Sequence, residues 1–221
     1  MILLFSGGLD SYIGWHFLHK PKTLYVGLGH RYMTHEIEKV KKLIPDTVID
    51  TRLNLADWEA RDANIPLRNA FLVMIASKYD KDVVLVVQEG EMSIPDRSPH
   101  FFNEFGEWLS FLWSETVTVS TPFFQMTKTE MVRWYLDHDL PAEDLIATRS
   151  CYAPTDNPCG NCAACFRRWV AFTNCDLEEE YDQPIKNFDG LQIYLDKLNR
   201  GIYEKKRTDE TLLALRKARI I

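Results

Sequence analysis

Short apolar runs alternate with segments of helical periodicity along the first 140 residues of the chain. The run at 83–87 is continuously apolar, which is typical of a strand buried on both faces of a parallel sheet. Strands are predicted at 1–5, 23–28, 47–51, 83–87 and 116–120, and helices at 9–18, 34–43, 68–79, 100–112 and 127–138. This alternation predicts an α/β fold with a doubly wound parallel sheet. In the helix at 100–112, Trp108, Phe111 and Leu112 form a stripe that is expected in a core or an interface.

The pattern changes after about residue 140. A loop rich in Pro, Asn, Asp and Cys leads to a predicted helix at 163–172, and a charged tail carries predicted helices at 191–199 and 208–218. We therefore expect an α/β domain over 1–140, in which a glycine-rich loop at 6–11 indicates nucleotide binding. A cysteine-rich region over 141–175, expected to bind zinc, and a helical extension over 176–221 follow it. The extension is expected to be an appendage or a dimer arm, which favours a homodimer.

The composition is that of an ordinary globular protein, since 46% of the 221 residues are hydrophobic and 26% are charged. The formal net charge of −6 argues against a basic face for nucleic acid, although a local pocket for one nucleotide is compatible with it. No apolar run reaches the ~20 residues of a membrane-spanning helix, and the apolar residues at 2–5 are too few for a signal peptide. We expect a cytoplasmic protein without a membrane or nucleic-acid partner.

A glycine-rich loop joins the first predicted strand to the first predicted helix. Its sequence is Ser6-Gly7-Gly8-Leu9-Asp10-Ser11. Glycines let the backbone approach a ligand closely, and the N–H groups of a helix start favour an anion. The serine hydroxyls can bind phosphate oxygens, whereas an acid such as Asp10 in a phosphate site makes sense as a partner of Mg²⁺. The loop lacks the Gly-Lys-Ser/Thr of a Walker A motif, and the alternative is a plain Ser-Gly turn.

Four of the five cysteines crowd into one short segment, whereas the cysteines of a disulfide scaffold are normally spread along a secreted chain. They are Cys151, Cys159, Cys162 and Cys165. The short Cys-x2-Cys spacings suit a tetrahedral thiolate site, and four protein ligands leave no open position, so a structural zinc ion is expected. An iron–sulfur cluster is the alternative, since four thiolates also hold it. Cys175 stands apart and is expected to be an ordinary buried residue.

The glycine loop resembles the SGGxDS signature of PP-loop ATP pyrophosphatases, which cleave ATP between its α and β phosphates. Combined with the cysteine segment, which continues into Arg167-Arg168, it resembles the 7-cyano-7-deazaguanine synthase family. Three weaker landmarks fall in the order of that family. They are Ile65-Pro66-Leu67-Arg68-Asn69, Glu89 followed by Pro95-Asp96, and Thr121-Pro122 followed by Lys128 and Glu130. The resemblance covers residues 1 to about 172 and leaves the tail unexplained.

The resemblance implies an ATP-dependent carbon–nitrogen ligase that converts 7-carboxy-7-deazaguanine to 7-cyano-7-deazaguanine in queuosine biosynthesis. The carboxylate is adenylylated, ammonia displaces AMP to give an amide, and a second activation allows the amide to be dehydrated. Each activation consumes one ATP and releases pyrophosphate. Adenylylation is needed because oxide is a very poor leaving group, whereas AMP leaves readily, and cations must lie over the developing charge.

The resemblance also implies roles for individual residues. The ATP site would comprise Ser6, Gly7, Gly8, Leu9, Asp10, Ser11, His30 and Arg31, the last two near the adenosine edge. The catalytic residues would be Asp10, Arg68 and Lys128. The substrate site would comprise Arg68, Asn69, Glu89 and Asp96. The two carboxylates suit the N–H donors of a guanine-like base, with a solvated loop as their alternative, and ordinary surface charge is the alternative for the two catalytic cations.

The chain departs from the family pattern mainly near the implied substrate site. Gly90 stands where the pattern has an acid, Leu67 where it has a glycine, and Arg97 where it has a cysteine. Met92 and Ser93 replace a Ser-Gly pair. These departures suggest an altered acceptor, so one alternative is a ligase that stops at the amide or uses another amine. A tRNA-modifying PP-loop enzyme is a further alternative, but it would usually need catalytic cysteines or a basic RNA-binding face, and neither is evident in the sequence. A non-enzymatic interaction module fits less well, because the glycine loop is intact.

Overall fold

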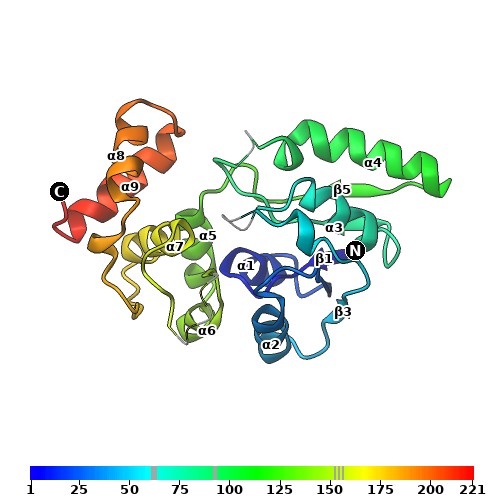
Figure 1. The fold of residues 1–221 in the computed structure, drawn as a ribbon, viewed down its shortest axis with the longest axis horizontal. Coiled ribbons are helices and arrows are strands. Elements are labelled where there is room, and N and C mark those ends of the chain that lie inside the picture. The colour runs from blue at the N-terminus through cyan, green and yellow to red at the C-terminus, as the bar shows by residue number, and fades with distance from the viewer. Residues whose placement is uncertain (61–63, 92–93, 152, 154, 156) are drawn as a thin grey trace. The chain divides into compact units, whose positions relative to one another are not determined.

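The computed structural model describes all residues of the chain except 61–63, 92–93, 152, 154 and 156 (Figure 1). Met92 and Ser93 therefore lie outside the described residues. The chain divides into two compact units. Unit 1 comprises Met1–Val87 and Glu91–Phe124, and unit 2 comprises Gln88–Gly90 and Gln125–Ile221. The division at residues 140 and 175 that the sequence suggests stays a prediction.

Unit 1 is an α/β fold built on five parallel strands in the order β3-β2-β1-β4-β5. The strands are β1 (Ile2–Leu4), β2 (Lys22–Val26), β3 (Val48–Asp50), β4 (Asp82–Val84) and β5 (Thr118–Ser120). The helices are α1 (Leu9–Phe17), α2 (Met33–Leu43), α3 (Arg68–Ala76) and α4 (Pro99–Trp113), with the short 3-10 helices η1 (Ala56–Trp58) and η2 (Pro95–Arg97). The predicted fold class is confirmed.

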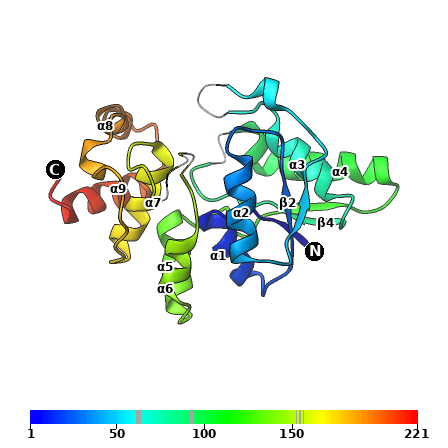
Figure 2. The ribbon, with the colours of Figure 1, turned by 60° about the horizontal axis from the view of Figure 1, so that its bottom comes forward.

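The sheet carries helices on both faces. Helices α3 and α4 cover one face and α1 and α2 cover the other, as two views show (Figures 1 and 2). Ile2 and Leu4 of β1 pack in one hydrophobic core with Val73 of α3 and Phe102 of α4. The chain runs outward from β1 to β3 and then returns to β4 on the other side of β1. Ligands of such sheets bind beyond the carboxyl ends of the strands at this reversal, which is where the glycine loop follows β1.

Some element ends differ from the predicted ones. Strand β4 ends at Val84 instead of residue 87, and the N–H of Val87 donates to Oγ1 of Thr121 at 3.1 Å. Helix α3 ends at Ala76 instead of residue 79, and the hydroxyl of Ser77 donates to the Met74 carbonyl at 2.8 Å. Side-chain hydroxyls thus take over backbone bonds at both ends, which periodicity alone does not reveal.

The apolar stripe of α4 lies on the surface of the chain. Phe111 is 79% exposed, Leu112 is 55% exposed and Trp108 is 49% exposed. From the sequence, the stripe is expected in a core or an interface. The core is therefore excluded for it, and the interface stays a prediction. Among the described residues, no helix is both long and apolar enough to cross a bilayer.

Unit 2 is helical. Its helices are α5 (Lys128–Asp137), α6 (Ala142–Ala147), α7 (Ala163–Asn174), α8 (Leu191–Asn199) and α9 (Lys205–Lys217), with the 3-10 helix η3 (Ile185–Asn187). A capping box opens α5, since the Thr127 hydroxyl accepts from the Glu130 N–H at 3.1 Å and the Thr127 N–H donates to Glu130 Oε2 at 2.8 Å. Helix α6 was not predicted, because six residues carry too little periodicity.

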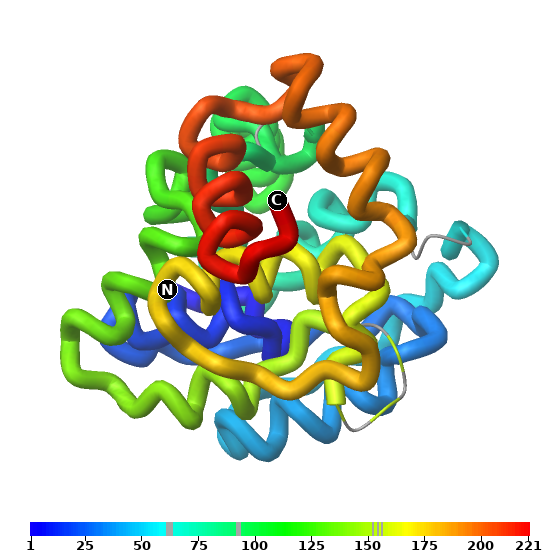
Figure 3. The backbone as a smooth tube through the Cα atoms, turned by 90° about the vertical axis from the view of Figure 1, so that its left-hand side faces the viewer, coloured from blue at the N-terminus to red at the C-terminus, as the bar shows by residue number. Residues whose placement is uncertain are grey.

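The tail helices share a core with the cysteine segment. Helix α9 packs against α7, and Figure 3 shows the two side by side in red and yellow. Tyr194 of α8 and Leu215 of α9 are buried in one hydrophobic cluster with Cys151, Cys165 and Phe166. The tail is therefore part of the packed interior of unit 2.

Candidate functional site

The glycine loop lies at the carboxyl end of the central strand β1 and opens helix α1. Gly7 has a φ of +71°, and a Cβ there would lie 3.3 Å from Cγ2 of Val40 in α2. The position therefore favours glycine on two grounds, backbone conformation and close packing. Gly8 is the N-cap of α1, and within the described residues no side chain caps this helix start. Its first N–H groups can therefore bind an anion.

The two serines of the loop lie close together. The Ser11 hydroxyl donates to the Gly8 carbonyl at 3.0 Å and accepts from the Ser6 N–H at 3.3 Å. The two hydroxyl oxygens are 3.4 Å apart, so both can reach one phosphate group. Asp10 lies in the first turn of α1, as predicted from its place in the motif. The loop has the donors that a polyphosphate needs and one carboxylate beside them.

The residues proposed at the adenosine edge are held by carboxylates of unit 1. His30 is buried, with its Nε2 atom 3.0 Å from Oε2 of Glu36. The Tyr25 hydroxyl donates to the same oxygen at 2.8 Å, and burial, followed by the charge of Glu36, raises the pKa of Tyr25. Nε of Arg31 donates to Oε1 of the buried Glu59 at 2.8 Å. These contacts fix the segment after β2, and its contact with adenosine stays a prediction.

Two of the predicted substrate residues touch each other. The Asn69 N–H donates to Oδ2 of Asp96 at 3.2 Å, and the Asn69 Nδ2 atom donates to the Asp96 carbonyl at 3.2 Å. Asn69 is buried, and Arg68 precedes it as the half-buried first residue of α3. Next to Asp96, Arg97 forms an ion pair of 2.8 Å with Glu91. The start of α3 and the η2 turn therefore form one polar cluster.

Leu67 occupies the turn that leads into this cluster. Its φ is +59°, and the residue is 62% exposed. A left-handed backbone costs an ordinary residue roughly 1–2 kcal/mol relative to its preferred conformations. The turn therefore has the backbone that suits a glycine, the residue of the family pattern, even though leucine occupies it.

Glu89 and Lys128 belong to unit 2. The Glu89 N–H donates to the Met126 carbonyl at 2.9 Å, which ties the segment after β4 to the residues before α5. Lys128 is the half-buried first residue of α5. Oε2 of Glu89 accepts a hydrogen bond from Nζ of Lys206 in α9 at 3.0 Å. Lys206 was missed from the sequence because it lies in the charged tail, 117 positions from Glu89.

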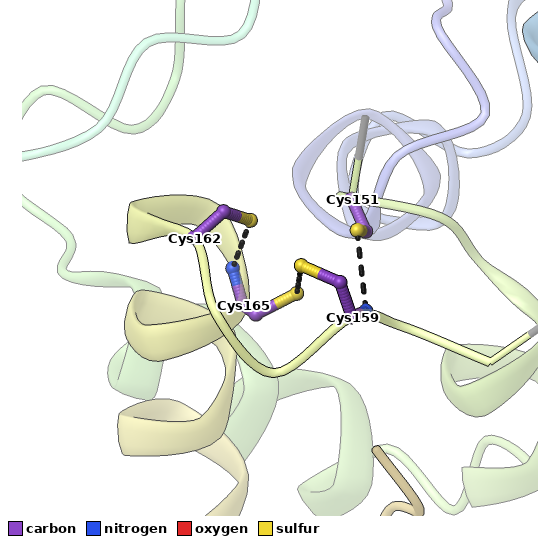
Figure 4. A group of neighbouring side chains, drawn as sticks. All are labelled: Cys151, Cys159, Cys162 and Cys165. Atoms are coloured by element: carbon purple, nitrogen blue, oxygen red, sulfur yellow. Dashed lines mark hydrogen bonds between the residues drawn. The ribbon is translucent and has the colours of Figure 1, made fainter. Parts of the chain in front are cut away.

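The four clustered cysteines converge on one point. Their sulfur atoms all lie within 4.8 Å of one another, and the Sγ atoms of Cys159 and Cys165 are 3.9 Å apart (Figure 4). Sulfur ligands about 2.3 Å from a tetrahedral zinc ion are roughly 3.8 Å apart, so the cluster fits such an ion. The four cysteines can therefore hold a metal ion, as the sequence predicts.

Backbone amides surround these sulfur atoms. The N–H groups of Ala153 and Cys159 both donate to Sγ of Cys151 at 3.4 Å, and the N–H of Cys165 donates to Sγ of Cys162 at 3.4 Å. Hydrogen bonds from the Cys162 and Cys165 thiols, supplemented by the amides, lower the pKa of Cys151, whereas burial raises the pKa of Cys159 to about 11. Amide donors of this kind favour the thiolates that a metal ion requires.

A comparison with protein families shows which family the chain belongs to. A family model described as queuosine biosynthesis protein QueC matches residues 21–176, which is more than half of the chain. The chain belongs to this family. The family prediction is confirmed, and with it the prediction of a ligase-type enzyme. The QueC match includes the four clustered cysteines and the positions of Arg68, Asn69, Glu89, Asp96 and Lys128.

Individual relatives extend the similarity along the chain. Three of them carry the name 7-cyano-7-deazaguanine synthase. The protein of Methanosphaerula palustris is 32% identical over 80% of this chain and 96% of its own length. That of Chlorobaculum tepidum is 23% identical over 84% and 96%, respectively. That of Methanosarcina mazei is 27% identical over 69% and 68%. Lys206 lies beyond the end of the QueC family match at residue 176.

Proposed function

We propose that this QueC-family protein converts 7-carboxy-7-deazaguanine to 7-cyano-7-deazaguanine with ATP and ammonia, releasing AMP and pyrophosphate. Membership of the family carries this proposal, together with a glycine loop built to bind phosphates at the carboxyl end of β1. The names of the relatives support the product, and the loop supports the use of ATP.

The chemistry consists of two activations of the same carbon. A carboxylate oxygen attacks the α phosphorus of ATP, pyrophosphate leaves, and ammonia then displaces AMP to give the amide and a proton. The amide oxygen attacks the α phosphorus of a second ATP and pyrophosphate leaves. Loss of AMP, which carries the oxygen away, and of the two N–H protons of the amide then gives the nitrile. The protein must hold the triphosphate and the base in line and offset the charge that develops at phosphorus.

The predicted residues have distinct proposed tasks in these steps. Ser6, Gly7, Gly8 and Ser11 bind the pyrophosphate portion of ATP, because their donors surround the start of α1. Asp10 would hold Mg²⁺, which neutralises phosphate charge when bound. Arg68 and Lys128 are the proposed cations for the phosphate or the substrate carboxylate. Asn69, Asp96 and Glu89 are the proposed groups for the base, and His30 and Arg31 for adenosine.

We propose that Cys151, Cys159, Cys162 and Cys165 hold a structural zinc ion. Four thiolates fill its coordination sphere, so the ion would tie the loop together without acting on substrate. Metal analysis of the purified protein tests this, with one zinc per chain expected, whereas iron with visible absorption would identify the iron–sulfur alternative. A thiolate site is also typical of a reducing compartment, which supports a cytoplasmic location.

We propose in addition that the chain forms a homodimer through the exposed stripe of α4. Apolar surface of this kind is typical of protein interfaces. Light scattering after size exclusion should give twice the chain mass, and Phe111→Ser should shift the mass toward the monomer. Ile193→Ser, which changes another exposed apolar residue in α8, serves as the matched control.

A related activity is the second candidate. The changes at Leu67, Gly90 and Arg97 lie next to the proposed substrate residues, which favours an altered acceptor or an earlier stopping point. The enzyme would then adenylylate the carboxylate but stop at the amide, or transfer the acyl group to another amine.

One incubation distinguishes these activities. The purified protein is mixed with Mg-ATP, ammonium and 7-carboxy-7-deazaguanine, and the bases are identified by mass spectrometry. Nitrile with two AMP and two pyrophosphate per base supports the proposed function, whereas amide alone supports the second candidate. Unchanged base with a folded, metal-loaded sample refutes the use of ammonia and this base.

The loop is tested by Asp10→Asn, which removes the charge at nearly constant size. We expect a loss of product formation of at least about 100-fold, because electrostatic stabilisation of the transferred phosphoryl group depends on it. Asp46→Asn, at an exposed position after α2, is the matched control and should retain full activity.

A further inference from the structure

The tail of unit 2 reaches one of the proposed substrate residues. Nζ of Lys206 donates to Oε2 of Glu89 at 3.0 Å, to the Gln125 carbonyl at 3.3 Å, and lies 3.2 Å from Oε1 of Glu130. The Lys206 side chain is 51% exposed, so one side of this contact faces solvent. The hydrogen bond to Glu89 is the main cause that raises the pKa of Lys206, and the hydrogen bond to Glu130 adds to it. The ammonium group of Lys206 therefore stays charged.

Other residues near the start of α9 contact the same segment. Gly90 has a φ of +86°, and a Cβ there would lie 3.0 Å from Oε2 of Glu204. Nη1 of Arg207 donates to the Gly90 carbonyl at 3.5 Å, and its guanidinium lies 4.0 Å from the ring centre of Tyr203. The tail therefore places one acidic and two basic side chains, those of Glu204, Lys206 and Arg207, next to Glu89 and Gly90. Gly90 is a position where the chain departs from the family pattern.

A different residue anchors α9. Glu210 accepts hydrogen bonds from the Thr127 and Thr129 hydroxyls at 2.5 and 2.8 Å, and its backbone carbonyl accepts from Nδ2 of Asn174 at 2.9 Å. Because Glu210 lies four residues after Lys206, the two side chains share one face of the helix. The helix is thus held in place one turn away from Lys206. An exposed ion pair by itself adds little to stability, so stability does not account for Lys206.

We propose that Lys206 is a positioning residue that orients the Glu89 carboxylate to recognise a guanine-like base. This inference rests on the proposed function, in which Glu89 accepts N–H groups of the base. Within the described residues, the hydrogen bond to the Glu89 side chain ends on Oε2, which leaves Oε1 available as an acceptor. A carboxylate held by an ammonium group presents its acceptor in a fixed direction, and N–H donors bind it strongly there. The tail beyond the QueC match thereby contributes to base selection.

Steady-state kinetics test this role. The concentration of 7-carboxy-7-deazaguanine is varied at saturating Mg-ATP and ammonium for the wild type, Lys206→Ala, Lys206→Arg and Lys205→Ala. We expect Lys206→Ala to raise KM for the base about 10-fold, as for loss of one charge-assisted contact, while KM for ATP changes less than about two-fold. Arginine should restore most of the affinity. Lys205→Ala removes the adjacent exposed lysine and should behave as the wild type.

A second base provides a readout that a structural role would not change. The analogue without the 2-amino group lacks one of the N–H donors proposed for Glu89. The wild type should discriminate against it, and Lys206→Ala should lose about 10-fold of that discrimination, with an unchanged melting temperature. Equal effects on both bases and on ATP, or a fall in melting temperature that accounts for the loss, would overturn the inference.

The outcomes for the inference and for the proposed function are separable. If the wild type makes product and Lys206→Ala keeps the same KM and discrimination, the inference fails and the proposed function stands. If the wild type binds the base without converting it, the proposed function fails, and dissociation constants of the same variants decide the inference. If the wild type neither binds nor converts the base, both fail.

Discussion

Arg168 provides the most demanding test of how unit 2 is held together. Its side chain is 1% exposed, and its Nε donates to both carboxylate oxygens of Glu179, at 2.9 and 2.8 Å. Its Nη1 atom donates to the Thr148 hydroxyl at 2.7 Å, and its Nη2 atom donates to the Leu145 carbonyl at 2.8 Å. The guanidinium also lies 4.5 Å from the ring centre of Phe172. One cation thus joins α7 to the segment before Cys151 and to the chain after Cys175.

The substitution Arg168→Met removes this charge at similar length. It leaves the Glu179 carboxylate, 3% exposed, without its cation, which costs about 3–5 kcal/mol. The Thr148 hydroxyl and the Leu145 carbonyl also lose a donor, at about 1 kcal/mol each. The expected loss in the free energy of unfolding therefore lies near the upper end of this range. With a urea dependence of about 2 kcal/mol per M, the unfolding midpoint should fall by roughly 2 M.

Release of the proposed metal ion to a colorimetric chelator reports on unit 2 alone, because the cysteines lie in that unit. Arg200→Met, at an exposed position after α8, is the matched control and should leave the midpoint unchanged. Adding Glu179→Leu to Arg168→Met should recover at least about 2 kcal/mol, since it removes the buried unpaired charge. A loss below 1 kcal/mol for the single variant, or no recovery in the double variant, would refute the reasoning.

Three further changes have expected outcomes. Leu67→Gly should raise the free energy of unfolding by up to about 1 kcal/mol in urea titrations, whereas Leu67→Val should lower it, because a branched residue tolerates a positive φ poorly. Burial raises the pKa of Cys175 from 9.0 to about 11, so the folded state favours its neutral thiol. The contribution of this thiol to the free energy of unfolding is complete below pH 9 and is lost as the pH rises toward 11. Cys175→Ala should therefore remove part of the alkaline fall in melting temperature, and an unchanged pH profile would contradict this. Chelation of the proposed metal ion should lower the melting temperature of unit 2 while unit 1 keeps its circular dichroism, and a shift of both units together would contradict it.

The fold could be predicted because its signals are local. The alternation of apolar runs and helical periodicity indicates the five strands and the helices between them, and β1 and α1 join at a motif with its own backbone requirements. The end of β4 could not be predicted, because it depends on the Thr121 hydroxyl, 34 positions away. The turn before α3 is a further case, since nothing in the residue type of Leu67 indicates a positive φ.

The same distinction, between contacts that are local in sequence and contacts between distant residues, applies to the candidate site. The serines of the glycine loop and the cysteines come together because each set lies close in sequence, so spacing alone indicates their chemistry. The partners of the other residues are distant in the chain. Glu59 binds Arg31 across 28 positions, and Asp96 binds Asn69 across 27. No pattern in a single sequence specifies such pairs, because they result from how helices and loops pack on the sheet.

The tail of unit 2 also shapes the loop that carries the four clustered cysteines. Gly160, inside the cysteine loop, has a φ of +70°, and a Cβ there would lie 1.9 Å from the carbonyl oxygen of Gln183. The Asp182 N–H donates to the Pro158 carbonyl at 2.9 Å, and Nδ2 of Asn161 donates to Oδ2 of Asp189 at 2.7 Å. The glycine that appears in the sequence as a turn residue is therefore also the place where the tail crosses the loop. Because any side chain there would displace the tail, the geometry of the cysteine loop and the position of the helices that follow it depend on each other. A chain segment without a motif thus helps to shape the four-cysteine cluster and, through Lys206, the surroundings of Glu89.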